Sequence, residues 1–342
     1  MQEAVQTMPK IELHRHLEGS LRLTTLLDIA LAEGVQLPTP VYSVEDMRPY
    51  VQMMPHEPRS WQHFMHKFTV LRQFFLSEAI IRRIAREAVE DAARDNVKYM
   101  ELRFTPYALS HLINCETREV VSWVCEAVQA AAQEQQIMVR LIVSVNRHES
   151  VEIAEEGAQA AIDHQHLGVV GLDLAGIEPG YAAHPFRQVF KRARSAGLGI
   201  TLHAGEWQGA QSVWDAISNI GADRIGHGIR TLEDSGIMQV LIERGIALEV
   251  CPSSNVETGA HSDLSSHPLP QLIAHGVKVT INTDDPLVFG VTLSDELRRA
   301  VEYMPLTLDD LKRQTIVAAE SAFLPPAERA ALVNQYKEWL YV

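Results

Sequence analysis

Cysteine is scarce in this chain of 342 residues, which contains only Cys115, Cys125 and Cys251. An odd number of cysteines without close pairing does not form a disulfide framework, and free thiols are typical of a reducing compartment. The first ten residues lack the apolar core of a signal peptide. No apolar run approaches the roughly 20 residues that a membrane-spanning helix needs. The sequence therefore predicts a cytoplasmic protein with no membrane segment.

Runs of lysine or arginine are also missing, and the formal net charge is −14. An acidic surface repels phosphate backbones, so we do not expect nucleic acid as a partner. No feature indicates an obligate protein partner. The chain contains neither a Gly-x-Ser-x-Gly elbow nor a phosphate-binding P-loop. It also lacks the Pro-Cys-x-x-Cys motif of one class of zinc deaminases, since it has only Cys251-Pro252, in the reverse order.

Short apolar strands alternate with helical segments along most of the chain, and the strand bodies are rich in Val, Ile and Leu. Regular alternation of this kind predicts a parallel sheet with crossover helices. Eight such units close a (β/α)8 TIM barrel, here with extra helices after strand 1 and at the C-terminus. The alternative is a doubly wound open sheet, but the first turn, Glu18-Gly19-Ser20, lacks its glycine-rich pattern. We expect one domain, residues 1–342, with strands at 10–16, 97–104, 138–145, 169–174, 199–203, 224–227, 246–251 and 277–282.

Histidines and acids occur where these strands end, and in a barrel those ends meet at one mouth. His14 and His16 lie two residues apart on the first strand, so their side chains face the same side. On its own this pair is more simply interpreted as two satisfied or exposed histidines. His203 at the end of strand 5 and Asp284 after strand 8 favour a metal site instead. Three histidines and a carboxylate suit one divalent ion, most simply zinc, with manganese, iron and cobalt left open.

Three further residues near these ends suit acid–base chemistry or substrate contact. Glu206 follows His203 after a tight turn, and His227 stands between two glycines that permit close approach of a ligand. A core histidine in a tight bend is the alternative for His227. Asp285 directly follows Asp284, and two adjacent acids repel each other unless a cation or a donor neutralises one of them. A turn or a helix cap before Pro286 explains the acidic pair equally well.

Six motifs resemble, in the same order, those of the adenosine deaminase family, and they span nearly the whole chain. They are His14-Arg15-His16-Leu17-Glu18-Gly19-Ser20, Asp173-Leu174-Ala175-Gly176, His203-Ala204-Gly205-Glu206, Arg224-Ile225-Gly226-His227-Gly228, Cys251-Pro252-Ser253-Ser254-Asn255 and Asn282-Thr283-Asp284-Asp285-Pro286. The resemblance implies a (β/α)8 barrel with one zinc ion per subunit. It also implies a purine-salvage enzyme that hydrolyses adenosine or 2′-deoxyadenosine to inosine or 2′-deoxyinosine and ammonia.

The resemblance further implies individual roles. The metal ligands would be His14, His16, His203 and Asp284. Glu206 matches the proton donor to purine N1. His227 matches the histidine that orients the attacking water and helps to take its proton.

The implied substrate contacts lie around the same site. Asp285 matches an acceptor that faces N7, Gly176 a backbone contact to N3, and Glu18 a contact to the sugar, while His16 also borders the substrate. Many family members carry Asp where this chain has Glu18. The family commonly continues with Asp-Glu after Gly176, whereas this chain continues Ile177-Glu178-Pro179. Both differences lie on the sugar side, so they leave the non-base part of the substrate open.

The alternatives concern the substrate and the reaction. Relatives in the same superfamily act on adenine or on 6-aminodeoxyfutalosine, a menaquinone precursor. A more distant alternative is a mononuclear metal-dependent amidohydrolase that cleaves an ester, lactone or amide, and another is a non-catalytic binding protein on the same barrel. The aromatic segment Trp61 to Phe75 has helical spacing, and we expect a lid over the mouth within Met54 to Phe75.

Overall fold

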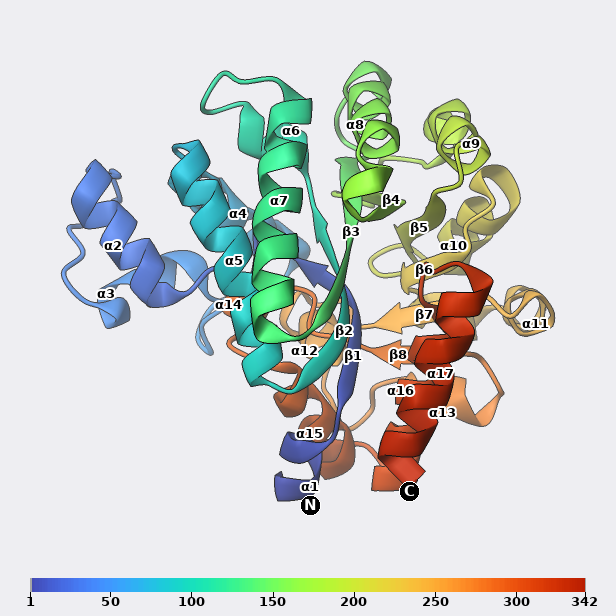
Figure 1. The fold of residues 1–342 in the computed structure, drawn as a ribbon. Coiled ribbons are helices and arrows are strands. Elements are labelled where there is room, and N and C mark those ends of the chain that lie inside the picture. Colours follow the sequence, from blue (N-terminus) through green and yellow to red (C-terminus); the bar gives the residue numbers. More distant parts are fainter. Residues whose placement is uncertain (1, 342) are drawn as a thin grey trace.

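The structure is a computed structural model that describes residues 2–341. In this range, eight strands form one parallel sheet in which each strand pairs with its neighbours in the sequence. The sheet curls into a barrel, and helices surround it (Figure 1). The expected (β/α)8 fold is therefore confirmed. The strands are β1 (Lys10–His16), β2 (Val97–Phe104), β3 (Met138–Asn146), β4 (Val169–Ala175), β5 (Gly199–Ala204), β6 (Arg224–His227), β7 (Ala247–Val250) and β8 (Val279–Ile281).

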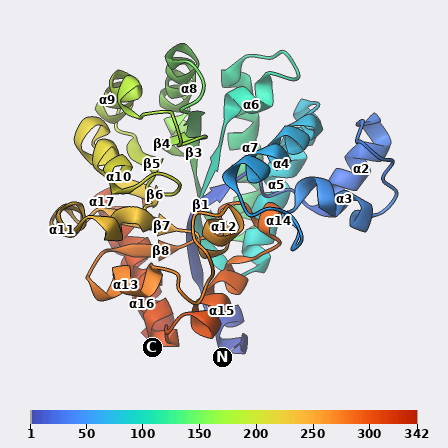
Figure 2. The same ribbon diagram turned by 180° about the vertical axis from the view of Figure 1, so that it is seen from behind.

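The helices connect successive strands along the outside of the barrel, as the view from behind also shows (Figure 2). Helix α5 illustrates why they form: the Ser77 side chain caps its start by accepting a hydrogen bond from the Ile80 amide, and Ile81, Ile84 and Ala88 are buried on one face. The bounds are α1 (Gln2–Thr7), α2 (Leu23–Glu33), α3 (Val44–Val51), α4 (Trp61–Leu71), α5 (Glu78–Arg94), α6 (Pro106–Ser110), α7 (Thr117–Gln135), α8 (Val151–Asp163), α9 (Arg187–Ser195), α10 (Ala210–Asp215), α11 (Ser235–Arg244), α12 (Pro252–Glu257), α13 (Leu269–Ala274), α14 (Pro286–Phe289), α15 (Leu293–Tyr303), α16 (Leu308–Ser321) and α17 (Pro326–Tyr341).

The insertion after β1 carries the extra helices that the sequence predicts. Helices α2 and α3 lie at one edge of the molecule, beside α4 and α5, in both views (Figures 1 and 2). A short 3₁₀ helix, η1 (Arg72–Phe74), continues α4. The C-terminal pair α16 and α17 is also present, and the two helices pack against each other.

The barrel closes between β1 and the segment that follows β8. The backbone amide of His16 donates to the Asp284 carbonyl (2.8 Å), and the Asp284 amide donates to the His14 carbonyl (3.0 Å). Side chains complete the seam, because the Leu13 amide donates to Asn282 Oδ1 (2.9 Å). The backbones of His14 and His16, two candidate metal ligands on β1, are thus hydrogen-bonded to the backbone of Asp284, a third candidate ligand.

The interior of the barrel is more polar than the apolar strand bodies indicate. The Arg103 guanidinium lies 2.6 Å from Glu249, and Arg224 lies 2.5 Å from both Glu249 and Glu101. All four side chains are buried. Burial alone would raise the pKa of Glu249, but Arg103 and Arg224 hold it well below its usual value. The expectation of apolar strand bodies is therefore wrong for the inward-facing positions, where paired charges fill the barrel.

No helix between residues 2 and 341 is long and apolar enough to cross a membrane.

Replacing Arg224 by methionine should lower the free energy of unfolding by about 3–5 kcal/mol, because it leaves Glu101 buried without its ion-pair partner and leaves Glu249 with Arg103 as its only arginine partner. Chemical denaturation followed by circular dichroism measures this change. The matched control is Arg194→Met, which removes an exposed ion pair with Asp223. This substitution should lower the free energy of unfolding by less than about 1 kcal/mol. If the two substitutions lower the free energy of unfolding equally, the buried ion pairs contribute no more to stability than the exposed one.

Candidate active site

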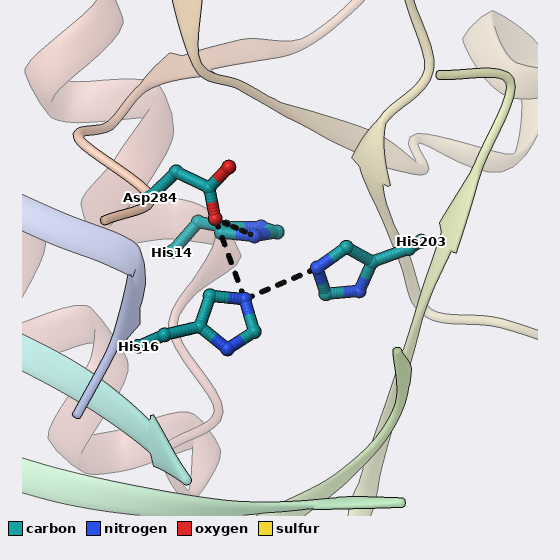
Figure 3. A group of neighbouring side chains, drawn as sticks. All are labelled: His14, His16, His203 and Asp284. Carbon is teal, nitrogen blue, oxygen red and sulfur yellow. Dashed lines mark hydrogen bonds and ion pairs between the residues drawn. The ribbon is translucent and has the colours of Figure 1, made fainter. Parts of the chain in front are cut away.

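Three histidines and one aspartate converge at the carboxyl end of the barrel (Figure 3). His14 and His16 come from β1, His203 from β5, and Asp284 from the segment after β8. One ligand atom from each residue lies within 4.8 Å of all the others. The structure thus brings together all four residues that the sequence suggests as metal ligands.

Three of the distances between these atoms suit ligands of one metal ion. His16 Nε2 lies 3.2 Å from His203 Nε2, and Asp284 Oδ1 lies 3.3 Å from His14 Nε2 and 3.4 Å from His16 Nε2. A zinc ion with metal–nitrogen bonds of roughly 2.0–2.1 Å holds neighbouring ligand atoms roughly 3.3 Å apart. His14 Nε2 is buried and has no hydrogen-bond partner. These observations fit a divalent cation at the centre of the four side chains.

Two buried carboxylates orient the histidines from behind. His14 Nδ1 lies 2.8 Å from Glu249 Oε2, and His203 Nδ1 lies 3.1 Å from Asp173 Oδ1. A carboxylate at Nδ1 favours the tautomer with the hydrogen on Nδ1, which leaves the Nε2 lone pair free for a metal. Burial would lower the pKa of His14, but Asp284 and Glu249 raise it. Burial lowers the pKa of His16 and His203, which favours the neutral rings that a metal binds.

The backbone at two site residues adopts a conformation that non-glycine residues rarely accept. Asp284 has φ of 65° and His227 has φ of 60°. Such left-handed conformations cost free energy and persist where the surrounding structure enforces them, often at functional sites. In both residues the strained backbone directs a buried side chain into the mouth of the barrel.

Glu206 follows β5 on a turn that another carboxylate holds in place. Glu178 accepts hydrogen bonds from the backbone amides of Gly205, Glu206, Trp207 and Gln208, at distances from 2.7 to 3.2 Å. It also accepts one from the Ser212 hydroxyl. An ionised carboxylate only accepts hydrogen bonds, so its two oxygens suit this ring of donors. Glu178, which the sequence presents as part of a departure from the family, therefore fixes the Glu206 turn.

Two acids at the site favour their protonated forms. Burial raises the pKa of Glu206 well above its usual value, and repulsion from Asp284 and Glu178 adds to the rise. Burial likewise raises the pKa of Asp285, helped by the charge of Asp284. Asp284 itself differs, since the neighbouring histidines hold its pKa low despite burial. The mouth thus combines one ionised ligand with two carboxylic acids that can donate protons.

His227 lies between the acid and the metal centre. Its Nε2 is 3.5 Å from Glu206 Oε2 and 3.9 Å from Asp284 Oδ2, and its Nδ1 contacts the Asn255 side-chain amide at 3.1 Å. Cys251 approaches His227 and Asp284 closely enough to form a second potential metal group. Burial raises the pKa of the Cys251 thiol well above its usual value, which favours the protonated thiol over a thiolate ligand.

A cavity of about 60 Å³ opens above these residues. Glu18, Gly176 and Asp285 line it together with the catalytic candidates, whereas His14 lies beneath it. Gly19 makes room for this arrangement, because a Cβ there would lie 1.9 Å from Asp285 Oδ1. All sequence-predicted substrate contacts thus border one cavity.

Helix α4 forms the outer wall of the cavity. Phe64, Met65 and Phe68 line it, and the Phe64 ring stacks on Phe289 with centroids 5.5 Å apart. Trp61 meets Trp207, on the turn that carries Glu206, at a centroid distance of 6.0 Å. The segment expected to contain a lid therefore does border the mouth.

A larger open groove, of about 1030 Å³, lies at the opposite end of the barrel. Its walls include Val169, Gly199, Arg224 and Ala247, which begin β4 to β7. Catalytic residues of such barrels lie at the carboxyl ends of the strands, while the amino ends serve stability. The smaller cavity is therefore the candidate active site.

Sequence reasoning missed the residues that support the site rather than form it. Glu249 and Glu178 are the clearest examples. A charged residue inside the apolar strand Ala247–Val250 is the signal that could have revealed Glu249. Glu178 gives no such signal, because its donors lie some thirty residues further along the chain.

Comparisons with known proteins agree with this geometry. The profile of the family described as adenosine deaminase matches residues 9–339. An adenosine deaminase from Klebsiella pneumoniae subsp. pneumoniae is 37% identical over 329 residues, which cover 96% of this chain and 98% of that protein.

Two solved structures share the fold over nearly their full length. Adenine deaminase from Arthrobacter aurescens superposes with a TM-score of 0.89 at 27% identity, covering 98% of this chain and 100% of that one. The N6-methyl-AMP deaminase from Arabidopsis thaliana superposes with a TM-score of 0.85 at 29% identity, covering 99% and 98%.

Replacing His203 by alanine should abolish stoichiometric metal binding, because it removes one of four ligands from the cluster. Metal content after dialysis, measured by mass spectrometry, checks this. His275→Ala, which removes an exposed histidine, should leave the metal content unchanged. Full occupancy in the His203 variant would exclude this residue as a ligand.

Replacing Glu178 by glutamine should lower kcat by about 100-fold, the order expected when a reacting group moves by about 1 Å. The glutamine NH2 group would face backbone donors and displace the Glu206 turn. Metal content should stay at the wild-type value, because Glu178 contacts no proposed ligand. Wild-type kcat in this variant would refute the positioning role.

Proposed function

The chain belongs to the adenosine deaminase family, and from that premise we propose that it hydrolyses adenosine or 2′-deoxyadenosine to inosine or 2′-deoxyinosine and ammonia. The observation that carries the proposal is a buried Glu206 with a raised pKa, in a cavity next to four candidate metal ligands. An ester- or amide-cleaving enzyme on the same barrel needs no such acid opposite a ring nitrogen.

We propose that His14, His16, His203 and Asp284 hold one zinc ion. When bound, the metal supplies Lewis acidity, which lowers the pKa of water toward about 7 and makes it a nucleophile. Three imidazole nitrogens and one carboxylate that lie close together support zinc over magnesium or calcium, which prefer oxygen ligands.

The side chains around the centre would share the proton transfers. Attack at C6 disrupts the aromatic ring, and a proton delivered to N1 by Glu206 offsets this cost as the new bond forms. His227, next to both Glu206 and Asp284, orients the water and helps to move its proton toward the departing amine. When the C6–N bond breaks and the C6 carbonyl forms, one hydrogen of the water leaves with ammonia. The other passes from the C6 hydroxyl to Glu206, whose own proton stays on N1.

The resemblance suggests that Asp285 accepts a hydrogen bond from N7, but the direction of this hydrogen bond must be reversed. Purine N7 is itself a hydrogen-bond acceptor, so an acceptor cannot bind it. Asp285 has a raised pKa and a buried Oδ1 without a partner. We therefore propose that its protonated carboxyl donates to N7, while the Gly176 backbone faces N3 and Glu18 faces the sugar.

Ammonia release from metal-loaded protein tests the proposal. Adenosine, 2′-deoxyadenosine, adenine and 6-aminodeoxyfutalosine should be compared by kcat/KM. We expect a nucleoside to be the preferred substrate over free adenine. Deamination of none of these 6-aminopurines would refute the assignment.

Replacing Glu206 by glutamine should lower kcat by about 100- to 10,000-fold, because the amide cannot donate a proton to N1 and recover it. Metal content should not change, since Glu206 lies outside the ligand set. Glu243→Gln, on the exposed face of α11, is the matched control. In the wild type, kcat/KM should fall as the pH rises through the raised pKa of Glu206, because the proton is then lost. Activity of the glutamine variant near the wild-type value would remove Glu206 as the donor.

A further inference from the structure

One cation borders a cavity that is otherwise rich in acids. Arg72, in η1 at the end of α4, is the sole lysine or arginine among the lining residues that the structure describes. Glu18, Glu206, Asp284 and Asp285 line the same cavity. The purine contacts and the proton transfers proposed above make no use of a guanidinium.

Arg72 also lacks partners within the protein. Its Nε is buried and makes no hydrogen bond. No ion pair involving Arg72 occurs within 4.0 Å among residues 2–341, although other arginines of this range form many. A buried donor without a partner costs about 1–3 kcal/mol, and more if it is charged. The side chain is therefore in a state that a bound acceptor would stabilise.

The surroundings of Arg72 place it on the sugar side of the cavity. Its charge influences the pKa of Glu18, Glu149 and His148, so these groups lie near it. Glu18 is the residue that matches the sugar contact, and its Oε1 accepts from the Thr105 amide at 2.6 Å. Thr105 lines the cavity as well.

The two nearby acids do not neutralise Arg72. Glu18 Oε2 and Glu149 Oε2 are both buried without hydrogen-bond partners. Neither acid comes within 4.0 Å of the Arg72 guanidinium. An anion that enters the cavity next to Arg72 therefore meets a guanidinium that no carboxylate already neutralises at contact distance.

Resting on the deaminase function proposed above, we propose that Arg72 forms an anion subsite that selects 6-aminopurine nucleosides bearing a carboxylate or phosphate beyond the 5′ carbon. A guanidinium binds both groups through two parallel N–H donors, which lysine or glutamine cannot reproduce. The subsite extends the substrate class from plain adenosine to its anionic 5′ derivatives.

The test compares kcat/KM for adenosine, AMP and 6-aminodeoxyfutalosine in the wild type and in Arg72→Gln. AMP carries a phosphate, and 6-aminodeoxyfutalosine carries a carboxylate. At least one anionic substrate should exceed adenosine in the wild type. Arg72→Gln should then lower its kcat/KM relative to adenosine by about 10- to 100-fold, as expected for loss of a hydrogen bond to a charged group. Whichever substrate shows this loss identifies the anion.

Two controls keep the outcome clear. Arg94→Gln removes an exposed arginine of α5 and should not change the substrate ratios. Arg72→Lys keeps the charge and should give an intermediate ratio, and it replaces the glutamine variant if circular dichroism shows that the latter does not fold. Deamination of adenosine with ratios unaffected by Arg72, or an equal loss on all three substrates, overturns the subsite but leaves the proposed function intact. Inactivity of the wild type on all three would remove both.

Discussion

Closure of the barrel is the constraint on which the site depends. The hydrogen bonds that join β1 to the segment after β8 are made by the backbones of His14, His16 and Asp284. The same residues carry three of the four proposed metal ligands. Their side chains therefore converge because the sheet closes, and a shift of register at the seam would separate them. The geometry of the proposed metal site therefore depends directly on correct closure of the barrel.

Buried charges connect that seam to the rest of the barrel. Glu249 contacts His14 on one side and Arg103 and Arg224 on the other. Its carboxylate thus orients a ligand while the two arginines compensate its burial. Glu178 plays a comparable part for Glu206 by gathering the amides of the following turn. Carboxylates outside the cavity thus fix the direction of the groups inside it.

The sequence predicts the parts of the site that depend on chain order. Strand ends meet in any (β/α)8 barrel, so His14, His203 and Asp284 could be placed from alternation alone. The bounds of β1, β2 and β6 also agree with prediction. Short helices such as α6 and α12 were not predicted, because four to six residues give too little period to recognise. Contacts of Glu178 and Glu249, and the isolation of Arg72, depend on distant residues and become visible only in three dimensions.

In the proposed site, Asp284 binds the metal, Glu206 and Asp285 hold protons toward the purine ring, and Arg72 lies toward the sugar. We propose that these groups together promote the addition of water to C6 of an intact nucleoside. A single turnover of adenosine in water enriched with heavy oxygen, followed by mass spectrometry, tests it most directly. We expect inosine that carries the heavy oxygen in its C6 carbonyl, together with an equal amount of ammonia. Release of adenine and free sugar, or inosine without the label, would contradict it.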